Sequence, residues 1–289
     1  MQNPFSQQYS EEENHHLLKE VLAGNKDALD ELIKLHQAFI YNVAWKMVHN
    51  PDDAHDLTQE TLIKVITRLS QFNFRSSFRT WLYRIVVNEF LQSKRKKTEE
   101  VFSSFGDHAT RLHSIETTSL SVEEEFEMKE LTKEMRIRCM SGMLMCLTRE
   151  QRLVYIIGDF FGINHKLGAE IFNISKENFR IKLHRSRKEL HNYMHNNCGL
   201  VNVKNSCRCS AKAKALKEKG LLNEKDMLFN ISYSKQVRNY ASQEYEAVNE
   251  LFDRKYIELY REHPMKEDFT KDNIIENIIQ DKEILSYFN

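Results

Sequence analysis

FNFRSSFRTWLYRI, residues 72–85, is the stretch that decides how this chain is interpreted. Aromatic and arginine side chains alternate along it, and its second half has helical apolar spacing. Aromatic rings can stack on unpaired bases, while arginines hold the backbone of the same strand. The alternative is that the aromatics form an ordinary core, which we expect for Phe78, Leu82 and Ile85. A flipped base also needs hydrogen-bonding groups around it, and the candidates are Asn73, Ser76, Ser77 and Thr80.

A second stretch, ninety residues on, has the pattern of a helix-turn-helix. Residues 165–172 predict a short helix, residues 173–175 a turn, and Ser175 caps a basic helix from Lys176 to about Tyr193. The start of such a helix can reach base edges in a major groove, and its later basic residues meet phosphates. The alternative is an ordinary basic surface helix, but the preceding helix and capped turn favour DNA binding. The residues expected to be buried are Phe179, Leu183 and Leu190.

The composition predicts an all-α protein with two or three small domains. The 289 residues include only three prolines and eight glycines, so breaks in helices are few. The formal net charge of zero conceals blocks of opposite sign. Residues 64–97 hold nine basic residues and one acid, residues 176–195 six basic and two acidic, and residues 98–130 two basic and nine acidic. Basic helices of this kind favour a polyanionic partner.

The same patterns suggest a domain organisation. We expect helical domains at 15–97 and 129–195, with the third helix of the first domain running from about Ser77 to Lys96. Between them, 98–128 is expected to be a solvated acidic linker with at most short helical pieces. A segment rich in cysteine and lysine follows at 196–220, and 221–289 keeps the apolar spacing of a helical, regulatory extension.

Several classes of protein are disfavoured. No apolar run approaches the roughly 18 residues of a membrane span, and the N-terminus has no signal-peptide stretch, so we expect a cytoplasmic protein without a membrane partner. The chain has no glycine-rich phosphate loop, no paired carboxylates in a plausible pocket and no Ser/His/Asp arrangement. We therefore expect no enzyme activity and no required cofactor.

The cysteine segment is a candidate metal site. Cys198, Cys207 and Cys209, with His195 upstream, offer three thiolates and an imidazole, which suit zinc or another thiophilic metal. The alternative is that these are unligated thiols in a flexible joint. Nearby cations are expected to lower the thiol pKa values; they are Lys204, Arg208 and Lys212. Two further cysteines lie among apolar residues and are expected to be core thiols; they are Cys139 and Cys146.

Two pairs of motifs resemble a known family. DDAHDLTQET (52–61) followed by FRTWLYRIVVN (78–88) resembles the second conserved region of extracytoplasmic-function sigma factors. LTREQR (147–152) followed by LHRSRKEL (183–190) resembles their fourth region, in matching order and spacing. The resemblance implies a protein that binds core RNA polymerase, recognises promoter DNA and nucleates promoter melting, with an anti-sigma factor as a further partner. It also implies that a cysteine-containing tail regulates the protein.

The resemblance also assigns residues. Those implied to dock on polymerase are Asp53, Asp56, Leu57, Gln59 and Glu60. Those implied to hold the melted strand of the minus-ten element are the loop from Asn73 to Ser77, with Trp81 and Asn88. The residues implied to contact phosphates are Arg75, Arg79, Arg84 and Lys94 to Lys97. The helix implied to read the minus-thirty-five element exposes Lys176, Asn178, Arg180, Lys182, Arg185 and Arg187.

Two positions depart from the family pattern and affect only the promoter sequence. Ile181 stands where a polar residue is common, and Gln92 where an aspartate is common. A helix-turn-helix regulator that acts without core polymerase is the alternative function. It needs no single-strand site, so replacing Trp81 with alanine would leave its DNA affinity unchanged.

Overall fold

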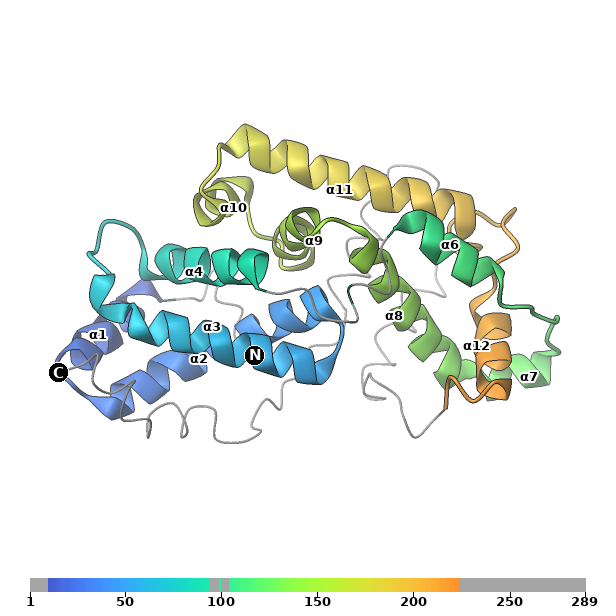
Figure 1. The fold of residues 1–289 in the computed structure, drawn as a ribbon, viewed down its shortest axis with the longest axis horizontal. Coiled ribbons are helices and arrows are strands. Elements are labelled where there is room, and N and C mark those ends of the chain that lie inside the picture. The colour runs from blue at the N-terminus through green and yellow to red at the C-terminus, as the bar shows by residue number, and fades with distance from the viewer. Residues whose placement is uncertain (1–9, 94–98, 100–103, 224–289) are drawn as a thin grey trace. The chain divides into compact units, whose positions relative to one another are not determined.

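A computed structural model describes residues 10–93, 99 and 104–223 (Figure 1). Every regular element in these residues is helical, which confirms the predicted all-α class. None of the helices within the described ranges is long and apolar enough to cross a bilayer. The predicted extension after residue 223 and the basic run Lys94 to Lys97 lie outside the described residues.

The chain contacts define two compact units. The described part of the first holds residues 10–93 and 156–182, and that of the second holds residues 99, 104–155 and 183–223. Residues 156–182 thus pack with the first unit, whereas the sequence grouped them with 129–195. The domain boundaries given above stay predictions.

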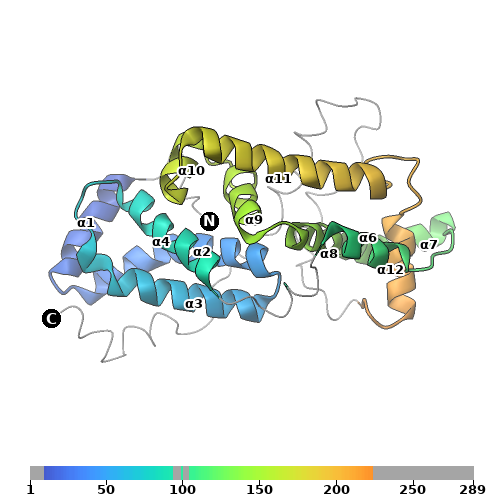
Figure 2. The same cartoon turned by 45° about the horizontal axis from the view of Figure 1, so that its top comes forward.

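The helices of residues 10–93 begin and end according to local capping rules. The elements are α1 (Glu11–Leu22), α2 (Lys26–Val48), α3 (Pro51–Thr67), η1 (Leu69–Gln71) and α4 (Phe78–Gln92). The Asn25 and Asn50 side chains accept hydrogen bonds from the first turns of α2 and α3, and Pro51 opens α3. Figure 2 shows α2 and α3 side by side, and α2 also packs on α1.

A buried histidine joins three of these helices. His36 on α2 is 1% exposed, and its Nδ1 and Nε2 atoms lie 3.1 Å from the Tyr83 hydroxyl and 2.8 Å from Asn14 Oδ1. Burial, with a smaller effect of Arg79, lowers the pKa of His36 to about 3. The ring is therefore neutral at pH 7 and links α1, α2 and α4 through hydrogen bonds.

The first unit also includes the π-helix η2 (Ile156–Phe160), α10 (His165–Phe172) and the start of α11 (Lys176–Asn197). Helix α10 packs against α4, and Arg84 Nε donates to the Glu170 carbonyl oxygen at 2.6 Å. The expected bounds of the helix at 165–172 are confirmed.

The second unit surrounds a long helix. Its elements are α6 (Phe105–His113), α7 (Val122–Glu127), α8 (Lys129–Cys146), α9 (Arg149–Tyr155), the end of α11 and α12 (Cys209–Glu218). Helix α8 packs against α12, α6, α7 and α9. The buried Arg152 guanidinium pairs with Glu99 at 2.8 Å and donates to the Leu144 and Met145 carbonyl oxygens at 3.0 Å.

The acidic segment 98–128 is not wholly solvated. Its described residues include the short helices Phe105–His113 and Val122–Glu127, as expected, but His108, Leu112 and Glu99 are buried. Leu112 joins an apolar cluster with α8 and α12, and His108 Nδ1 hydrogen-bonds the Tyr193 hydroxyl. The prediction of a solvated linker was wrong for these residues. A count of charged residues cannot show that His108 and Leu112, two of the nine residues of α6, face a core.

Candidate nucleic-acid interface

The loop before α4 and the first residue of α4 carry both buried and exposed aromatic rings. Phe72 is 5% exposed and Phe78 is 0% exposed, whereas Phe74 is 48% exposed. Phe74 has φ +58°, in the left-handed region, and its ring centroid lies 4.8 Å from that of Phe72. Asn73 Oδ1 accepts from the Arg75 backbone N–H at 3.2 Å, and the His15 ring meets Phe74 edge-on. The loop therefore presents one ring to solvent.

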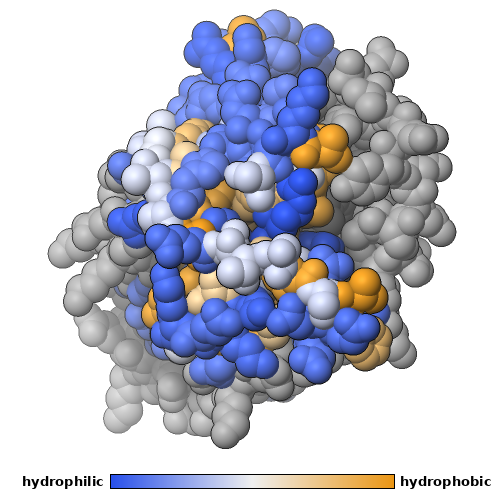
Figure 3. Space-filling model, turned by 90° about the vertical axis from the view of Figure 1, so that its right-hand side faces the viewer, coloured by the Kyte–Doolittle hydropathy of each residue, from blue (hydrophilic) through white to orange (hydrophobic). Residues whose placement is uncertain are grey.

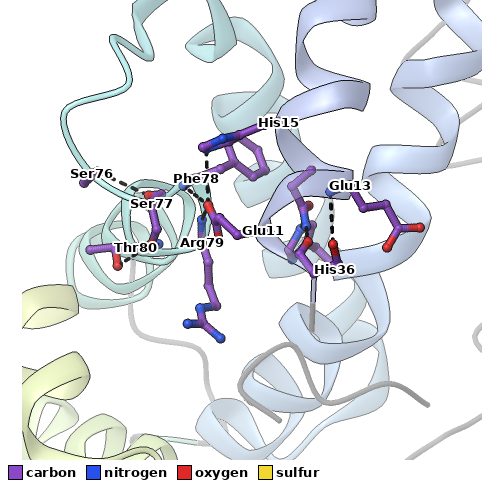
Figure 4. A network of polar contacts seen from close by, with 11 residues as sticks. Glu11, Glu13, His15, His36, Ser76, Ser77, Phe78, Arg79 and Thr80 are labelled. Atoms are coloured by element: carbon purple, nitrogen blue, oxygen red, sulfur yellow. Dashed lines mark hydrogen bonds and ion pairs between the residues drawn. The ribbon is translucent and has the colours of Figure 1, made fainter. Parts of the chain in front are cut away.

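The start of α4 is fixed from two sides (Figure 4). Ser77 is the N-cap, and its Oγ accepts from the Thr80 backbone N–H at 3.1 Å. The Glu11 carboxylate on α1 accepts from the backbone N–H of Phe78 and, at 3.4 Å, from that of Arg79. A carboxylate at a helix N-terminus is favoured by the exposed N–H groups and the helix dipole. Helix α1 thus helps to position the loop.

Trp81 lies half-buried beside the loop. Its ring stacks on Phe78 with centroids 5.7 Å apart and planes at 29°, and it also contacts Phe72. Tyr83 and Thr80 are buried, so neither lines a surface pocket, contrary to the suggestion for Thr80. The core interpretation is therefore correct for Phe72, Phe78, Leu82, Tyr83 and Ile85, and the accessible rings are Phe74 and Trp81.

Polar candidates of this region differ in accessibility. Asn73, Arg75 and Asn88 are exposed, and Arg79 and Ser77 are half-buried. Arg84 is half-buried, with its Nε–H directed at the Glu170 carbonyl oxygen.

Four of the five residues assigned to polymerase docking are accessible on α3. Asp56 and Glu60 are exposed, and Asp53 and Gln59 are half-buried. Residues 53, 56 and 60 have the three- and four-residue spacing of one helix face. Leu57 is 0% exposed and packs in the core, so it supports the helix and offers no surface to a partner.

The helix-turn-helix has close internal packing. Gly168 on α10 faces the buried Phe179 ring, leaving no space there for a side chain. Asn173 ends α10 in the left-handed conformation with φ +53°, and Ser175 Oγ accepts from the Asn178 backbone N–H at 3.1 Å. The expected turn and cap are confirmed. The angle between α10 and α11 thus depends on a glycine, a left-handed asparagine and a serine cap.

Helix α11 has an apolar side and a basic side. Phe179, Leu183 and Leu190 are buried, as expected. Ile181 is 47% exposed on the outer side. The basic and polar candidates on it are accessible: Lys176, Asn178, Arg180 and Arg185 are exposed, and Lys182 and Arg187 are half-buried.

The cysteine segment follows α11. Burial is the largest effect on Cys198, Cys207 and Cys209, and it raises the pKa of each thiol above its usual value. The expectation that cations lower these pKa values overall was therefore wrong, although Arg208 partly opposes burial at Cys198 and Cys207. The His195 ring is exposed and stacks with His191.

Sequence reasoning did not single out two residues of this region. Phe74 lay within the assigned loop, but the sequence did not show that its ring is 48% exposed while that of Phe72 is 5% exposed. Glu11 carries no sequence signal, because its contact with α4 spans 67 residues.

Comparisons with known proteins find similarity to RNA polymerase sigma factors. Residues 32–100 match the family model described as Sigma-70 region 2. The RNA polymerase sigma factor YlaC of Bacillus subtilis is 25% identical over 166 residues, which cover 57% of this chain and 91% of YlaC. The RNA polymerase sigma-H factor of Pseudomonas aeruginosa is 25% identical over 192 residues, covering 63% of this chain and 93% of that protein.

A shorter match has higher identity. The ECF RNA polymerase sigma factor SigW of Bacillus subtilis is 31% identical over 85 residues, covering 29% of this chain and 46% of SigW. Among solved structures, CnrH in complex with the cytosolic domain of CnrY superposes with a TM-score of 0.46 and 19% identity, over 64% of this chain and 99% of that chain.

Proposed function

We propose that this chain belongs to the RNA polymerase sigma factors of the extracytoplasmic-function type. On that premise, promoter recognition is divided between the loop before α4 and helix α11. Sigma factors of this type bind core RNA polymerase and promoter DNA, and this chain initiates transcription in that way. It acts where polymerase and chromosome lie, in the cytoplasm. An anti-sigma factor is a further proposed partner.

The observation that carries the proposal is the pair of accessible aromatics before and on α4. In our proposal Phe74 and Trp81 stack on bases of the melted strand, while Arg75 and Arg79 contact its phosphates. Stacking contributes about 1–3 kcal/mol per base, so binding energy holds the strands apart and no catalytic group is required.

Helix α11 is proposed to recognise duplex DNA upstream. Lys176, Asn178 and Arg180 lie at its start, from which side chains reach base edges. Arg185 and Arg187 lie further along and would contact phosphates. The acidic side of α3, with Asp53, Asp56 and Glu60, is the proposed contact with core polymerase.

In vitro transcription with core polymerase tests the loop. The promoter is identified beforehand by transcribing genomic DNA with the parent protein and core polymerase. We expect Phe74→Ala and Trp81→Ala each to reduce strand opening, measured by permanganate reactivity of unpaired thymines, by about tenfold, since 1.4 kcal/mol is tenfold. Binding to the upstream duplex should be kept. Phe126→Ala is the matched control, because Phe126 on α7 is 75% exposed. Equal opening by all three variants would contradict the proposal.

A second pair of variants tests α11. Arg180→Ala should weaken binding to the upstream element by about 1–3 kcal/mol and relax its sequence preference. Lys188→Ala, an exposed residue further along the same helix, should keep that preference. If the purified chain does not associate with core polymerase in a pull-down, the alternative of an independent helix-turn-helix regulator is favoured instead.

A further inference from the structure

Aromatic rings around the loop before α4 contact one another in a cluster. Phe72 lies at its centre and is 5% exposed. Its ring centroid lies 4.8 Å from that of Phe74 and 5.5 Å from those of Phe78 and Trp81. The ring of His15 joins this cluster from α1. The two rings that are accessible to a partner, Phe74 and Trp81, therefore rest on the same buried support.

Two rings support Phe74. It meets His15 edge-on, with centroids 5.5 Å apart and planes at 74°, and it meets Phe72 with planes at 54°. Edge-to-face contacts of this kind are favourable for aromatic pairs. In the part of the chain that the structure describes, the ring contacts of His15 are with Phe72 and Phe74, and not with Trp81. His15 thus supports one of the two accessible rings and not the other.

A second exposed phenylalanine lacks this support. Phe126 on α7 is 75% exposed, and the Lys129 ammonium lies 5.8 Å from its ring centroid. Figure 3 shows the right-hand side of Figure 1, where α7 lies; hydrophilic residues cover most of it, and apolar residues appear in separate patches. Single exposed apolar residues of that kind are ordinary. Phe74 differs because its ring is packed on two others although nearly half of it is exposed.

The position of His15 is set by α1 and by its link to α4. Glu11 and His15 are one helical turn apart, and Glu11 Oε1 lies 3.5 Å from His15 Nε2 (Figure 4). The same carboxylate oxygen accepts from the backbone N–H of Phe78, the first residue of α4. The His15 side chain is 36% exposed. The start of α4 and the Glu11 carboxylate therefore hold the His15 ring beside Phe74.

The backbone conformation at Phe74 also depends on its surroundings. Its φ of +58° lies in a region that is unfavourable for a residue with a bulky side chain. Asn73 Oδ1 accepts from the Arg75 backbone N–H across this residue at 3.2 Å. Such a conformation persists only where the surrounding contacts maintain it. The ring contacts with His15 and Phe72 are among these contacts, so loss of the His15 ring releases that of Phe74 to other orientations.

Helix α1 lies outside the part of the chain that matches the Sigma-70 region 2 model. The match covers residues 32–100, whereas α1 is Glu11–Leu22. The contacts of His15 are thus a feature of this chain's own fold and not of the matched region.

We propose that His15 is a positioning residue for the capture of the melted strand, and that α1 is therefore part of the strand-binding site. This inference rests on the proposed function of the loop before α4. His15 holds the Phe74 ring against Phe72, in the orientation in which it stacks on an unpaired base. It acts through Phe74 and not through Trp81. The role depends on an aromatic ring at position 15, so a phenylalanine there serves as well.

The complex of this chain with core polymerase tests the role of His15. Its affinity for a labelled single-stranded oligonucleotide with the sequence of the melted promoter strand is measured by fluorescence anisotropy. His15→Ala should weaken binding by about fourfold, because one edge-to-face ring contact no longer holds Phe74. His15→Phe should bind like the parent. His16→Ala is the matched control and should also bind like the parent, since His16 is exposed on the same helix and pairs with Glu20 at 3.4 Å.

Two double variants show which ring His15 acts on. In the Phe74→Ala background, His15→Ala should cause no further loss, whereas in the Trp81→Ala background it should still weaken binding by about fourfold. Parent-like binding by His15→Ala, weakened binding by His15→Phe, or a fully additive loss with Phe74→Ala would overturn the proposal. Urea unfolding confirms that each variant is folded. His15→Gln, which keeps much of the volume without an aromatic ring, replaces His15→Ala if that variant does not fold.

The outcomes separate this inference from the proposed function. If Phe74→Ala weakens strand binding and His15→Ala does not, only the role of His15 is wrong. If Phe74→Ala itself binds the strand like the parent, this ring does not stack on it, and the proposed function of the loop fails together with the inference.

Discussion

Replacing Gly168 with alanine tests whether the packing of α10 on α11 sets the DNA-reading geometry. An alanine Cβ would lie within 2.8 Å of three atoms of the Phe179 ring, which is 0% exposed and has no space to move into. Overpacking costs about 1–3 kcal/mol, and this overlap is severe. Alanine in place of a helical glycine recovers about 1 kcal/mol of helix propensity. We therefore expect a net loss of about 1–2 kcal/mol.

The assay combines urea unfolding with binding to upstream duplex DNA. Gly168→Ala should lower the unfolding midpoint and weaken duplex binding, because α11 is displaced from α10. Gly106→Ala is the matched control, since the nearest atom to its added Cβ is Ser104 Oγ at 3.6 Å, and it should be neutral or slightly stabilising.

A double variant separates overlap from other causes. Phe179→Leu should make room for the new methyl group, so Gly168→Ala should cost less in that background than in the parent. Equal stability of the Gly168 and Gly106 variants, or additive costs in the double variant, would refute the reasoning.

Three further predictions follow from buried polar contacts. Glu11→Gln should lower the free energy of unfolding by about 1 kcal/mol, because a charged acceptor leaves the α4 N-terminus, whereas the exposed Glu12→Gln should have no effect in the same urea titration. Arg152→Met should cost about 3 kcal/mol by calorimetry, since three carbonyl oxygens each lose a donor and the buried Glu99 loses one of its two cationic partners, keeping Arg149 at 3.2 Å. A cost no greater than that of the exposed Arg185→Met would contradict this. The free energy of unfolding should fall as pH drops from about 6.5, because His36 (pKa about 3) and His108 (pKa about 4) stay neutral in the folded state while the unfolded chain binds protons at both. The double variant His36→Gln, His108→Gln should show a smaller dependence of the free energy of unfolding on pH. An unchanged dependence would exclude these two groups as its cause.

Local signals predicted the helix-turn-helix well. Asn164, Asn173 and Ser175 are capping residues that act within three or four positions, so the bounds of α10 follow from the sequence. The apolar spacing of α11 likewise identifies Phe179, Leu183 and Leu190 as buried.

Long-range contacts account for what could not be predicted. Glu99 pairs with Arg152, 53 positions away, so an acidic stretch read as solvated includes a buried anion. Cys139 was expected to be a core thiol, and the packing of α12 on α8 places it against the same apolar cluster as Cys207. In the loop, the sequence pattern does not distinguish Phe72 from Phe74, whose rings are 5% and 48% exposed in the folded protein.

The left-handed backbone at Phe74 has an energetic consequence for the proposed capture of a melted strand. A side chain in this conformation costs about 1–2 kcal/mol, which the surrounding contacts supply when the chain folds. The ring is already 48% exposed in the protein without nucleic acid. A base that stacks on it does not have to order the loop, so little of the stacking free energy is spent on immobilising the receptor.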